Sequence, residues 1–403
     1  MTVRLTNDQA RVLRMSSNGL LRRAAEGEAS ARVVAAVDGC AGVQAQDLVA
    51  SQLAVRARAE AVIRQDVVDA CTSGSVVRSW FMRGTLHMVP AGTAGWLTTL
   101  LGPLTIAKYR GRRASLGLDD QVCAAASAAL PQILSRGPLE RAQLVAALRA
   151  SGVNIDPRGQ APAHLVLYAA SLGLIRRGPD NRTEPTYVLV DHADDADRAD
   201  PSEAAAELAR WYFSAFGPAT VEDFTAWSGL SASRARTAVG KLAGGEFAEA
   251  EVGGRTMWLP AGLPDTLDDC QAGVWRLLPA FDTFLVAYRD RELLINPASA
   301  KQVYAGGGWI HPAVLRDGMV VGTWRLRRQG GDTAVEVALF DDRDRAAELD
   351  GEISDVRLFF GDANPGRLVV GGVDHHRRGV MAVDAVEDAG EVLELAAEIV
   401  VQV

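Results

Sequence analysis

The spacing of apolar residues changes once along this chain of 403 residues. Up to about residue 265, apolar positions recur mostly every three or four residues, which is the period of amphipathic helices. From about Val274 onward they recur mostly every second residue, which is the period of strands. The pattern therefore predicts an α+β fold, in which a helix-rich part precedes a strand-rich part.

The first 115 residues read as helices followed by a hairpin. Caps and apolar periodicity predict helices near 5–21, 30–37, 48–62, 66–73 and 91–115, and β-branched and aromatic residues predict strands within 76–89. Helices followed by such strands are the order of a winged helix, with the hairpin as its wing. We therefore expect residues 1–115 to form one winged-helix unit.

The same order is expected twice more before the strand-rich part. Residues 116–195 contain helical patterns near 119–135, 138–150 and 162–174 and a strand near 186–190. An acidic, loop-like segment at 191–200 marks a boundary. Residues 196–265 then contain a helix near 203–216, a helix-turn-helix pattern and a hairpin around Gly253 and Gly254. About three tandem winged-helix units are therefore predicted.

Residues 270–403 are expected to form a small β-barrel or half-barrel. Its strands are predicted near 283–288, 312–316, 319–328, 333–339 and 356–360, and the acidic end at 384–398 would close it as a solvated helix or strand. Asp317-Gly318 predicts a tight hairpin turn, since this pair supplies the positive φ that such a turn needs. Arg316 would then lie at the tip of a narrow protrusion suited to a minor groove; an ordinary barrel turn is the alternative.

The residues with the strongest chemical pattern are Gln44 and Gln46, which flank Ala45 directly before a helical segment. Asp47 is a good N-cap for that helix, so the two glutamines are expected in an extended entry segment. On extended backbone, side chains two residues apart point to the same face. Two amides on one face can hold a single water by donating and accepting together. An exposed pair on a surface turn is the alternative.

Four groups of residues resemble the bacterial winged-helix DNA glycosylases. They are Gly42 to Asp47, Arg83 to Pro90, Leu278 to Phe284 with Tyr288 to Arg291, and Gly322 to Arg325. These groups keep their order and are spread from residue 42 to residue 325, so the resemblance covers most of the chain. That family excises bulky alkylated purines, including those in interstrand crosslinks.

The resemblance also implies roles for particular residues. The catalytic motif of the family is Gln-x-Gln or Gln-x-Asp, which implies Gln44 and Gln46 as catalytic residues and double-stranded DNA containing alkylated purines as the partner. Glutamine at both positions is similar to the branch linked to self-resistance against DNA-alkylating antibiotics such as azinomycin B. The resemblance favours a position for His87 near the site. Bulky, crosslinked lesions imply an open groove.

Composition restricts the protein class but not the activity. With 48% hydrophobic and 23% charged residues, the chain is ordinarily globular. The four cysteines form no Cys-x-x-Cys pair, so we expect reduced thiols, no metal and no cofactor. No apolar run could span a membrane and no signal peptide is recognisable, so we expect a cytoplasmic, nucleoid-associated monomer. The adjacent His375 and His376 are expected in a surface loop.

The charge distribution is uneven, which changes the meaning of the net charge of -8. Residues 1–118 contain 15 Arg or Lys against 8 Asp or Glu, net +7, while residues 341–403 contain 6 against 15, net -9. Such asymmetry can leave a local positive surface for DNA on an acidic protein; compositional drift is the alternative. Arginine outnumbers lysine 39 to 3, which fits phosphate recognition or a GC-rich genome.

Several basic residues are candidates for contacts with DNA. The alternatives are a structural histidine at 87, a solvated helix end at 108–113, and winged helices that bind protein instead of DNA. The full set of DNA-binding candidates is Arg78, Arg83, His87, Arg110, Arg112, Arg113, Arg234, Arg236, Arg316 and Arg325.

Three functions from different classes are consistent with these features. The first is a monofunctional DNA glycosylase, because none of the three lysines, Lys108, Lys241 and Lys301, lies near the glutamine pair to attack as an amine. The others are a winged-helix transcription regulator and a protein that sequesters a genotoxin. Release of a free alkylated base distinguishes the first function from the other two.

Overall fold

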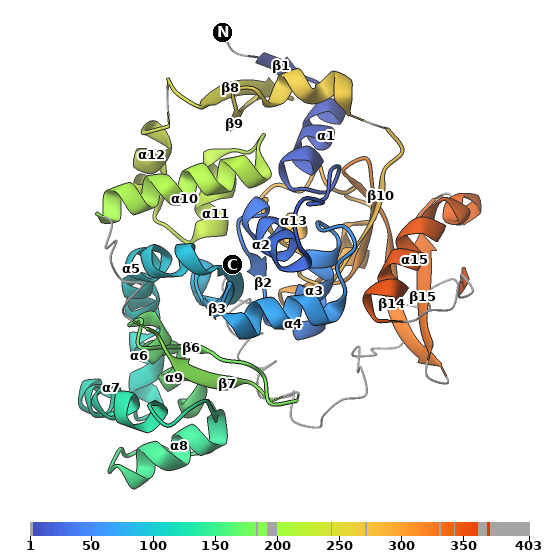
Figure 1. Ribbon diagram of the computed structural model, residues 1–403. Helices are drawn as coiled ribbons and strands as arrows, with labels where there is room; N and C mark the ends of the chain where they lie inside the picture. The colour runs from blue at the N-terminus through green and yellow to red at the C-terminus, as the bar shows by residue number, and fades with distance from the viewer. Residues whose placement is uncertain are drawn as a thin grey trace.

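A computed structural model describes residues 3–182, 184–191, 200–242, 244–270, 272–329, 332–341, 343–361 and 369–370. Helices with short strands between them make up the chain to about residue 260, and a mostly antiparallel five-stranded sheet follows (Figure 1). The predicted α+β class is therefore confirmed. In Figure 1 the first helical unit lies at the centre, the second at the lower left and the C-terminal sheet at the right.

The first unit places a three-stranded sheet against three helices. Strand β2 pairs with β4, and β4 pairs with β3. Helix α5 then packs on this sheet, and α6 follows it. The elements are α2 (Ala29–Gly39), β2 (Val43–Gln44), α3 (Leu48–Arg56), α4 (Arg64–Ser73), β3 (Val76–Trp80), the 3-10 turn η1 (Met82–Gly84), β4 (Leu86–Pro90), α5 (Ala91–Lys108) and α6 (Arg110–Ser115).

The second unit continues the same sheet. Strand β3 meets β6 at the pair Arg78 and Arg177, so six strands follow in the order β2-β4-β3-β6-β7-β5. At Gly102 the helix α5 comes so close to α9 that a β carbon would lie 2.1 Å from the backbone oxygen of Ser171. The elements are α7 (Asp120–Leu134), β5 (Leu139–Glu140), α8 (Arg141–Ala150), α9 (Ala161–Ser171), β6 (Ile175–Arg177) and β7 (Thr186–Leu189).

The third unit includes the N-terminal segment of the chain. Strand β1 pairs in parallel with β8, and α1, which begins with a capping box at Thr6, packs against α10. The Arg14 side chain donates to the backbone oxygen of Pro218 at 2.9 Å. The elements are β1 (Val3–Leu5), α1 (Asn7–Ser17), α10 (Pro201–Phe216), α11 (Val221–Ser228), α12 (Ala232–Gly240), β8 (Phe247–Val252) and β9 (Arg255–Pro260).

The strand-rich part is an open sheet in the residues that the structure describes. Its order is β10-β13-β14-β15-β16, and no pairing between β10 and β16 closes it into a barrel there. The predicted segment 384–398 and the pair His375 and His376 lie outside the described residues. The elements are η3 (Leu263–Asp269), β10 (Trp275–Leu278), α13 (Thr283–Val286), α14 (Ala300–Val303), β11 (Tyr304–Gly306), β12 (Trp309–Ile310), β13 (Ala313–Arg316), β14 (Met319–Gln329), β15 (Asp332–Leu339), η4 (Arg343–Leu349), α15 (Asp350–Phe359) and β16 (Val369–Val370).

Two of the strands predicted in this part are wrong. The segment 283–288 begins with helix α13, because the Asp282 carboxylate accepts a hydrogen bond from the Phe284 amide as an N-cap. The segment 356–360 belongs largely to α15, in which Ile353, Val356 and Phe359 are buried at intervals of three residues. That interval is a helical period, which a short window of apolar residues does not distinguish from a strand.

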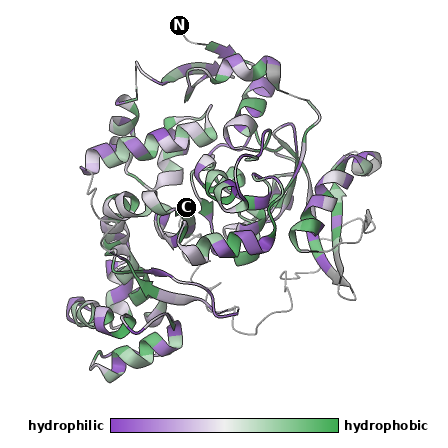
Figure 2. Ribbon diagram, in the orientation of Figure 1, coloured by the Kyte–Doolittle hydropathy of each residue, from purple (hydrophilic) through white to green (hydrophobic). Residues whose placement is uncertain are grey.

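The β2-β4-β3 sheet separates the two largest apolar clusters of the protein. Val43 and Met88 belong to the cluster on one face, together with residues of α2, α3 and α4. Val77 and Val89 belong to the cluster on the other face, together with residues of α5 and α10. Most helices around these clusters carry both hydrophobic and hydrophilic residues along their length (Figure 2). Polar side chains on the face of Val77 and Val89 would therefore be buried beside an apolar cluster, which makes them candidates for a functional site.

Candidate active site

The Gln44 and Gln46 side chains meet. Gln44 ends β2, and Asp47 caps α3 by accepting a hydrogen bond from the Ala50 amide at 2.8 Å. The intervening backbone is held to β4, since the Ala45 amide donates to the Leu86 oxygen at 2.8 Å. The Nε2 of Gln44 donates to the Oε1 of Gln46 at 2.7 Å. The predicted convergence of the two amides on one side of an extended segment is confirmed.

The turn that leads into this segment requires a glycine. Gly42 has a φ of 84°, in the left-handed region, and a β carbon there would lie 3.2 Å from both the Met88 oxygen and a methyl group of Val89. The close approach lets β2 lie directly against β4. Gln44 is buried and Gln46 is half-buried, so the pair lies at the edge of the protein interior.

His87 lies directly across from Gln44 in the sheet. The two residues are Cα partners in the β2–β4 pair, and Ser79 is the partner of His87 on β3. Directly opposed side chains on antiparallel strands lie on the same face and adjoin. Gln44, His87 and Ser79 therefore form a polar row on the face that also carries Val77 and Val89. His87 therefore lies beside Gln44, as expected, and its role stays a prediction.

The imidazole of His87 is neutral in this environment. Burial, and after it the positive charge of Arg83, lower the pKa of His87 to about 3, although the hydrogen bond to the Thr85 backbone opposes the shift. The Nδ1 of His87 lies 2.8 Å from the Thr85 oxygen. A carbonyl oxygen only accepts, so Nδ1 carries the ring proton.

Arg83 connects the β3–β4 hairpin of the first unit to the third unit. It is half-buried and has a φ of 58°, which non-glycine residues rarely adopt. Its Nη1 donates to the Trp227 backbone oxygen at 2.6 Å. Burial lowers the pKa of Arg83 to about 10. Desolvation and then the charge of Arg83 also lower the pKa of Lys108, which is exposed at the end of α5. A cationic group thus borders the polar row.

Two of the arginines predicted to bind DNA are buried instead. Arg78 pairs with both carboxylate oxygens of Asp180, at 2.7 and 2.9 Å, and donates to the Gly178 oxygen at 2.8 Å. Arg113 donates to the Ile106 oxygen at 2.9 Å and stacks on Tyr168. Both guanidinium groups are used to join elements, so their geometry gives no support to a phosphate contact.

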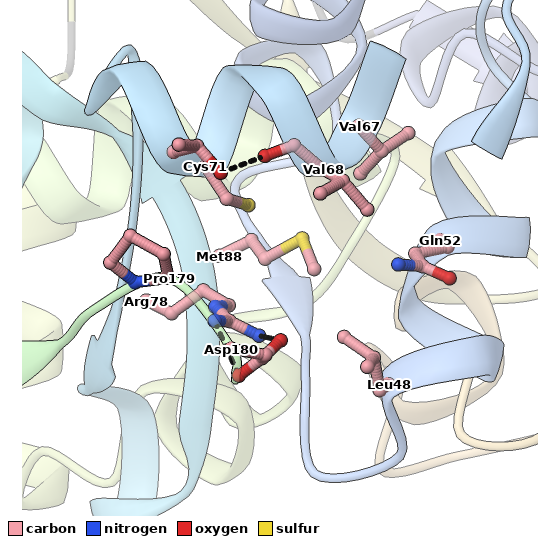
Figure 3. A pocket seen from close by; sticks show the side chains of 10 residues that line it. Leu48, Gln52, Val67, Val68, Cys71, Arg78, Met88, Pro179 and Asp180 are labelled. Atoms are coloured by element: carbon pink, nitrogen blue, oxygen red, sulfur yellow. Dashed lines mark hydrogen bonds and ion pairs between the residues drawn. The ribbon is translucent and has the colours of Figure 1, made fainter. Parts of the chain in front are cut away.

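The pocket around Arg78 lies on the other face of the sheet from the two glutamines. Figure 3 shows Arg78 pairing with Asp180, with Cys71 and Val68 on α4 above it and Leu48 and Gln52 on α3 at the right. Met88 also lines the pocket. Since Met88 alternates with His87 along β4, this pocket and the glutamine pair are on opposite faces.

The remaining predicted cations fall into two groups. Arg110, Arg112 and Arg236 are exposed, although Arg110 is 3.2 Å from Asp120 and Arg112 donates to Gln160 at 2.6 Å. Arg234 and Arg236 lie on α12 near its start, and the described structure gives neither side chain an ion-pair partner. The half-buried Arg325, by contrast, donates to Glu336 at 2.5 Å within the C-terminal sheet.

The turn at residues 316–318 is confirmed, but the protrusion predicted for it is wrong. Asp317 and Gly318 have φ values of 48° and 82°, as a two-residue hairpin turn requires. A β carbon on Gly318 would lie 2.7 Å from the Arg11 backbone oxygen, and Asp317 accepts hydrogen bonds from two amides of the preceding loop. Arg316 stacks on Trp275 at 5.1 Å. The turn packs onto α1 and does not project.

Sequence reasoning missed two features of the site. Ser79 joins the polar row, and aligning the 76–89 hairpin by its alternation would have placed it opposite His87. Lys108 was seen only as part of a basic segment and not as a charge within electrostatic reach of Arg83. Within the described ranges no three His, Cys, Asp or Glu side chains are grouped to hold a metal ion, and no helix is long and apolar enough to cross a membrane.

Known proteins resemble this chain over most of its length. A sequence model of the family described as "DNA glycosylase AlkZ-like" matches residues 37–359. An interstrand DNA cross-link repair glycosylase of Streptomyces sahachiroi is 30% identical over 320 residues, which cover 75% of this chain and 84% of that protein. The solved structure of Streptomyces sahachiroi DNA glycosylase AlkZ matches with a TM-score of 0.77 and 27% identity, over 91% of this chain and 100% of that one.

These matches agree with the resemblance seen in the sequence motifs, and the family match includes the glutamine pair, the polar row and the strand-rich part up to residue 359. The chain therefore belongs to the AlkZ-like DNA glycosylase family.

Proposed function

We propose that this protein is a monofunctional DNA glycosylase that hydrolyses the N-glycosidic bond of bulky N7-alkylated purines in double-stranded DNA, including purines held in interstrand crosslinks. The observation that supports this most directly is the 2.7 Å hydrogen bond between Gln44 and Gln46. It brings two amides together at the motif that the family resemblance implies is catalytic. Self-resistance to a DNA-alkylating natural product is the biological setting we propose.

An amide pair suits this chemistry because the leaving group is already activated. A purine alkylated at N7 is cationic, so when the bond between C1′ and N9 breaks, its electron pair neutralises the purine and leaves an oxocarbenium ion on the sugar. Little proton transfer is needed for that departure. The amide oxygens stabilise the developing positive charge, and the pair holds a water for the attack on C1′. The proton lost by that water passes to solvent.

The mutual hydrogen bond leaves one polar atom of each glutamine amide able to bind another group. In the part of the chain that the structure describes, no hydrogen bond uses the Oε1 of Gln44 or the Nε2 of Gln46. These atoms supply one acceptor and one donor, which is the set that fixes the orientation of a single water. Side-chain amides are not titratable, so the pair keeps this arrangement at every pH at which the protein is folded.

The three helical units are proposed to be winged helices that hold the DNA. In each of the first two, a helix, a short strand, two helices and two strands follow in order; the third replaces the short strand with the bridge between Ala219 and Trp258. In the third unit Arg234 and Arg236 start the second helix of a helix-turn-helix, where such motifs contact DNA. A monomer that binds through several such surfaces can leave an open groove for a bulky lesion.

The decisive experiment is the incubation of the protein with a duplex that carries one N7-alkylguanine, followed by chromatography for free base. We expect the alkylated base and an intact strand with an abasic site. Trapping with borohydride should give no covalent complex, because no lysine attacks C1′. Binding without base release would support the transcription regulator, and binding of the free genotoxin without DNA would support the sequestering protein.

A further inference from the structure

The polar row next to the glutamine pair contains one group that the proposed mechanism does not use. His87 is buried on a sheet face that otherwise packs against the apolar cluster with Val77 and Val89. Its Cα partner is Gln44, so its ring adjoins the catalytic amide. Burying a ring with two polar nitrogens is unfavourable unless both form hydrogen bonds, to protein or to water. One nitrogen, Nδ1, is accounted for by the Thr85 oxygen at 2.8 Å.

The other nitrogen is an acceptor. A neutral imidazole has one N–H, and the contact with a carbonyl oxygen places that proton on Nδ1. The Nε2 atom therefore presents a lone pair. Thr85 cannot reverse this assignment, because its hydroxyl already donates to the Met82 oxygen at 3.0 Å and lies 3.5 Å from the same Nδ1.

We infer that His87 is a third catalytic residue, whose Nε2 accepts a hydrogen bond from the water held by Gln44 and Gln46 and so turns the oxygen lone pair of that water toward C1′. This inference rests on the proposed glycosylase function. His87 acts as a fixed acceptor and does not take the proton. The groups that face it explain why: Arg83 is the cation beside it, and no carboxylate is among the groups that shift its titration.

A neutral His87 also avoids destabilising the transition state. An imidazolium next to Gln44 would repel the positive charge that develops on the sugar, whereas a lone pair attracts it. The buried ring and the neighbouring guanidinium group therefore hold the one protonation state that helps the reaction. A glutamine at position 87 would keep an acceptor oxygen, while a leucine would remove it and keep the bulk.

The test compares His87→Leu, His87→Gln and the control Ser171→Ala, which removes a buried hydroxyl of α9 outside the site that donates to the Leu167 oxygen at 2.7 Å. Single-turnover base release from an N7-methylguanine duplex, the Kd for undamaged duplex and thermal melting are measured for each. We expect His87→Leu to slow release by roughly 10-fold to 100-fold with a Kd within about threefold of wild type. His87→Gln should recover a large part of that rate, and Ser171→Ala should change it little.

Two further readouts separate the inference from its alternatives. The release rate of the wild type should stay flat between about pH 5 and pH 9, because His87 does not titrate there. NMR of the protein labelled with nitrogen-15 in histidine should show His87 as the Nδ1–H tautomer over that range. A tenfold fall in rate per pH unit below about pH 6.5 would make His87 a proton acceptor and overturn the inference.

Equal rates for His87→Leu and the wild type, or an Nε2–H tautomer, would also overturn it. If the wild type releases no base although NMR shows the expected tautomer, the proposed function has failed while the described geometry of His87 stands. Loss of rate in all three variants with lowered melting temperatures would assign His87 to folding and not to catalysis.

Discussion

At the scale of single residues, the glutamine pair is the part of the site that local signals predict best. An N-cap at Asp47 and the alternation of extended backbone are enough to place both amides on one side. The hydrogen bond between them is not predictable from the sequence, since it depends on how Gly42 sets β2 against β4. The sequence therefore indicates which residues converge but not how they contact one another.

Charge alone did not distinguish buried from exposed arginines. Arg78 follows Val77 on β3 and faces Asp180, a residue of the second unit that lies 102 positions away in the chain. Arg113 is in a cluster of four cations, yet its side chain turns inward to Tyr168. Such partners come from distant segments, and no local pattern names them.

The buried ion pair between Arg58 and Asp282 should be important for stability. The Nη2 of Arg58 lies 2.7 Å from the Oδ1 of Asp282, and both side chains are almost fully buried. Arg58 also donates a hydrogen bond to the Oδ1 of Asn18. Asp282→Ala leaves a buried guanidinium without a counter-charge, so we expect a loss of about 3–5 kcal/mol in the free energy of unfolding. Urea denaturation measures this loss.

The control for that variant is Asp8→Ala, which removes an exposed carboxylate that pairs with Arg11. An exposed pair of this kind contributes less than about 1 kcal/mol. Similar losses in the free energy of unfolding for Asp282→Ala and Asp8→Ala would show that burial does not increase the contribution of the Arg58 and Asp282 pair to stability.

At the scale of elements, long helices and the hairpins with clear alternation were predicted correctly. The errors fall on short segments: residues 283–288 and 356–360 were expected as strands and are largely helical. The N-cap at Asp282 decides the first segment and the buried stripe of α15 decides the second, and a window of five or six residues carries too little periodicity to reveal either.

The contact between α5 and α9 provides a test with a matched pair of glycines. Gly102→Ala would place a methyl group 2.1 Å from the Ser171 oxygen if nothing moved, so we expect a loss of about 1–3 kcal/mol as the helices separate. Gly92→Ala lies on the same helix with no atom within 4 Å, and should be neutral or stabilising by up to about 1 kcal/mol.

Urea denaturation of the two glycine variants measures both effects. A stabilising Gly102→Ala would contradict the close approach of α5 and α9.

The free energy of unfolding should depend on pH through Glu352, which lies on helix α15. Desolvation opposes its charged form, but the guanidinium groups of Arg56, Arg23 and Arg276 outweigh desolvation and lower the pKa of Glu352 below its ordinary value. A carboxyl group with a depressed folded-state pKa stabilises the protein above its unfolded value, about 4.3, and this contribution is lost as the pH falls through the folded value.

Glu352→Gln should therefore be less stable than the wild type at pH 7 and should lose less stability between about pH 5 and pH 3. Urea midpoints over this range test the expectation. Urea midpoints that change with pH in parallel for the wild type and Glu352→Gln would mean that Glu352 has the same pKa in the folded and unfolded states.

At the scale of the whole molecule, the arrangement of the units was not predictable from local patterns. One sheet spans the first two units through the pair of Arg78 and Arg177, and β1 and α1 pack on the third unit although the predicted domain 1–115 includes them. These pairings join segments that are far apart in sequence. The domain boundaries themselves stay a prediction.

DNA binding should depend on the half-buried Arg234 and the exposed Arg236, which the described structure leaves without an ion-pair partner, and not on the buried arginines. Replacing Arg234 and Arg236 with alanine should weaken binding to all sequences, and each lost phosphate contact should reduce the slope of log K against log salt by about 0.9. Arg78→Ala should lower stability but leave that slope unchanged, because its guanidinium pairs with Asp180. Titrations of a fluorescent duplex at several salt concentrations measure both.

An unchanged slope in the Arg234 and Arg236 variant would remove α12 from the DNA surface. A reduced slope of log K against log salt in a fully folded Arg78→Ala variant would show that Arg78 contacts DNA.

The central claim is that the amides of Gln44 and Gln46 act on the transition state of base release. The measurement that tests it most directly is single-turnover release of N7-alkylguanine from a duplex by Gln46→Ala, beside its Kd for the same duplex and the exposed control Gln121→Ala. We predict that Gln46→Ala loses most of the release rate, about 100-fold or more, with a Kd within a few-fold of wild type. Release at the wild-type rate, or equal losses of rate and affinity, would contradict the claim.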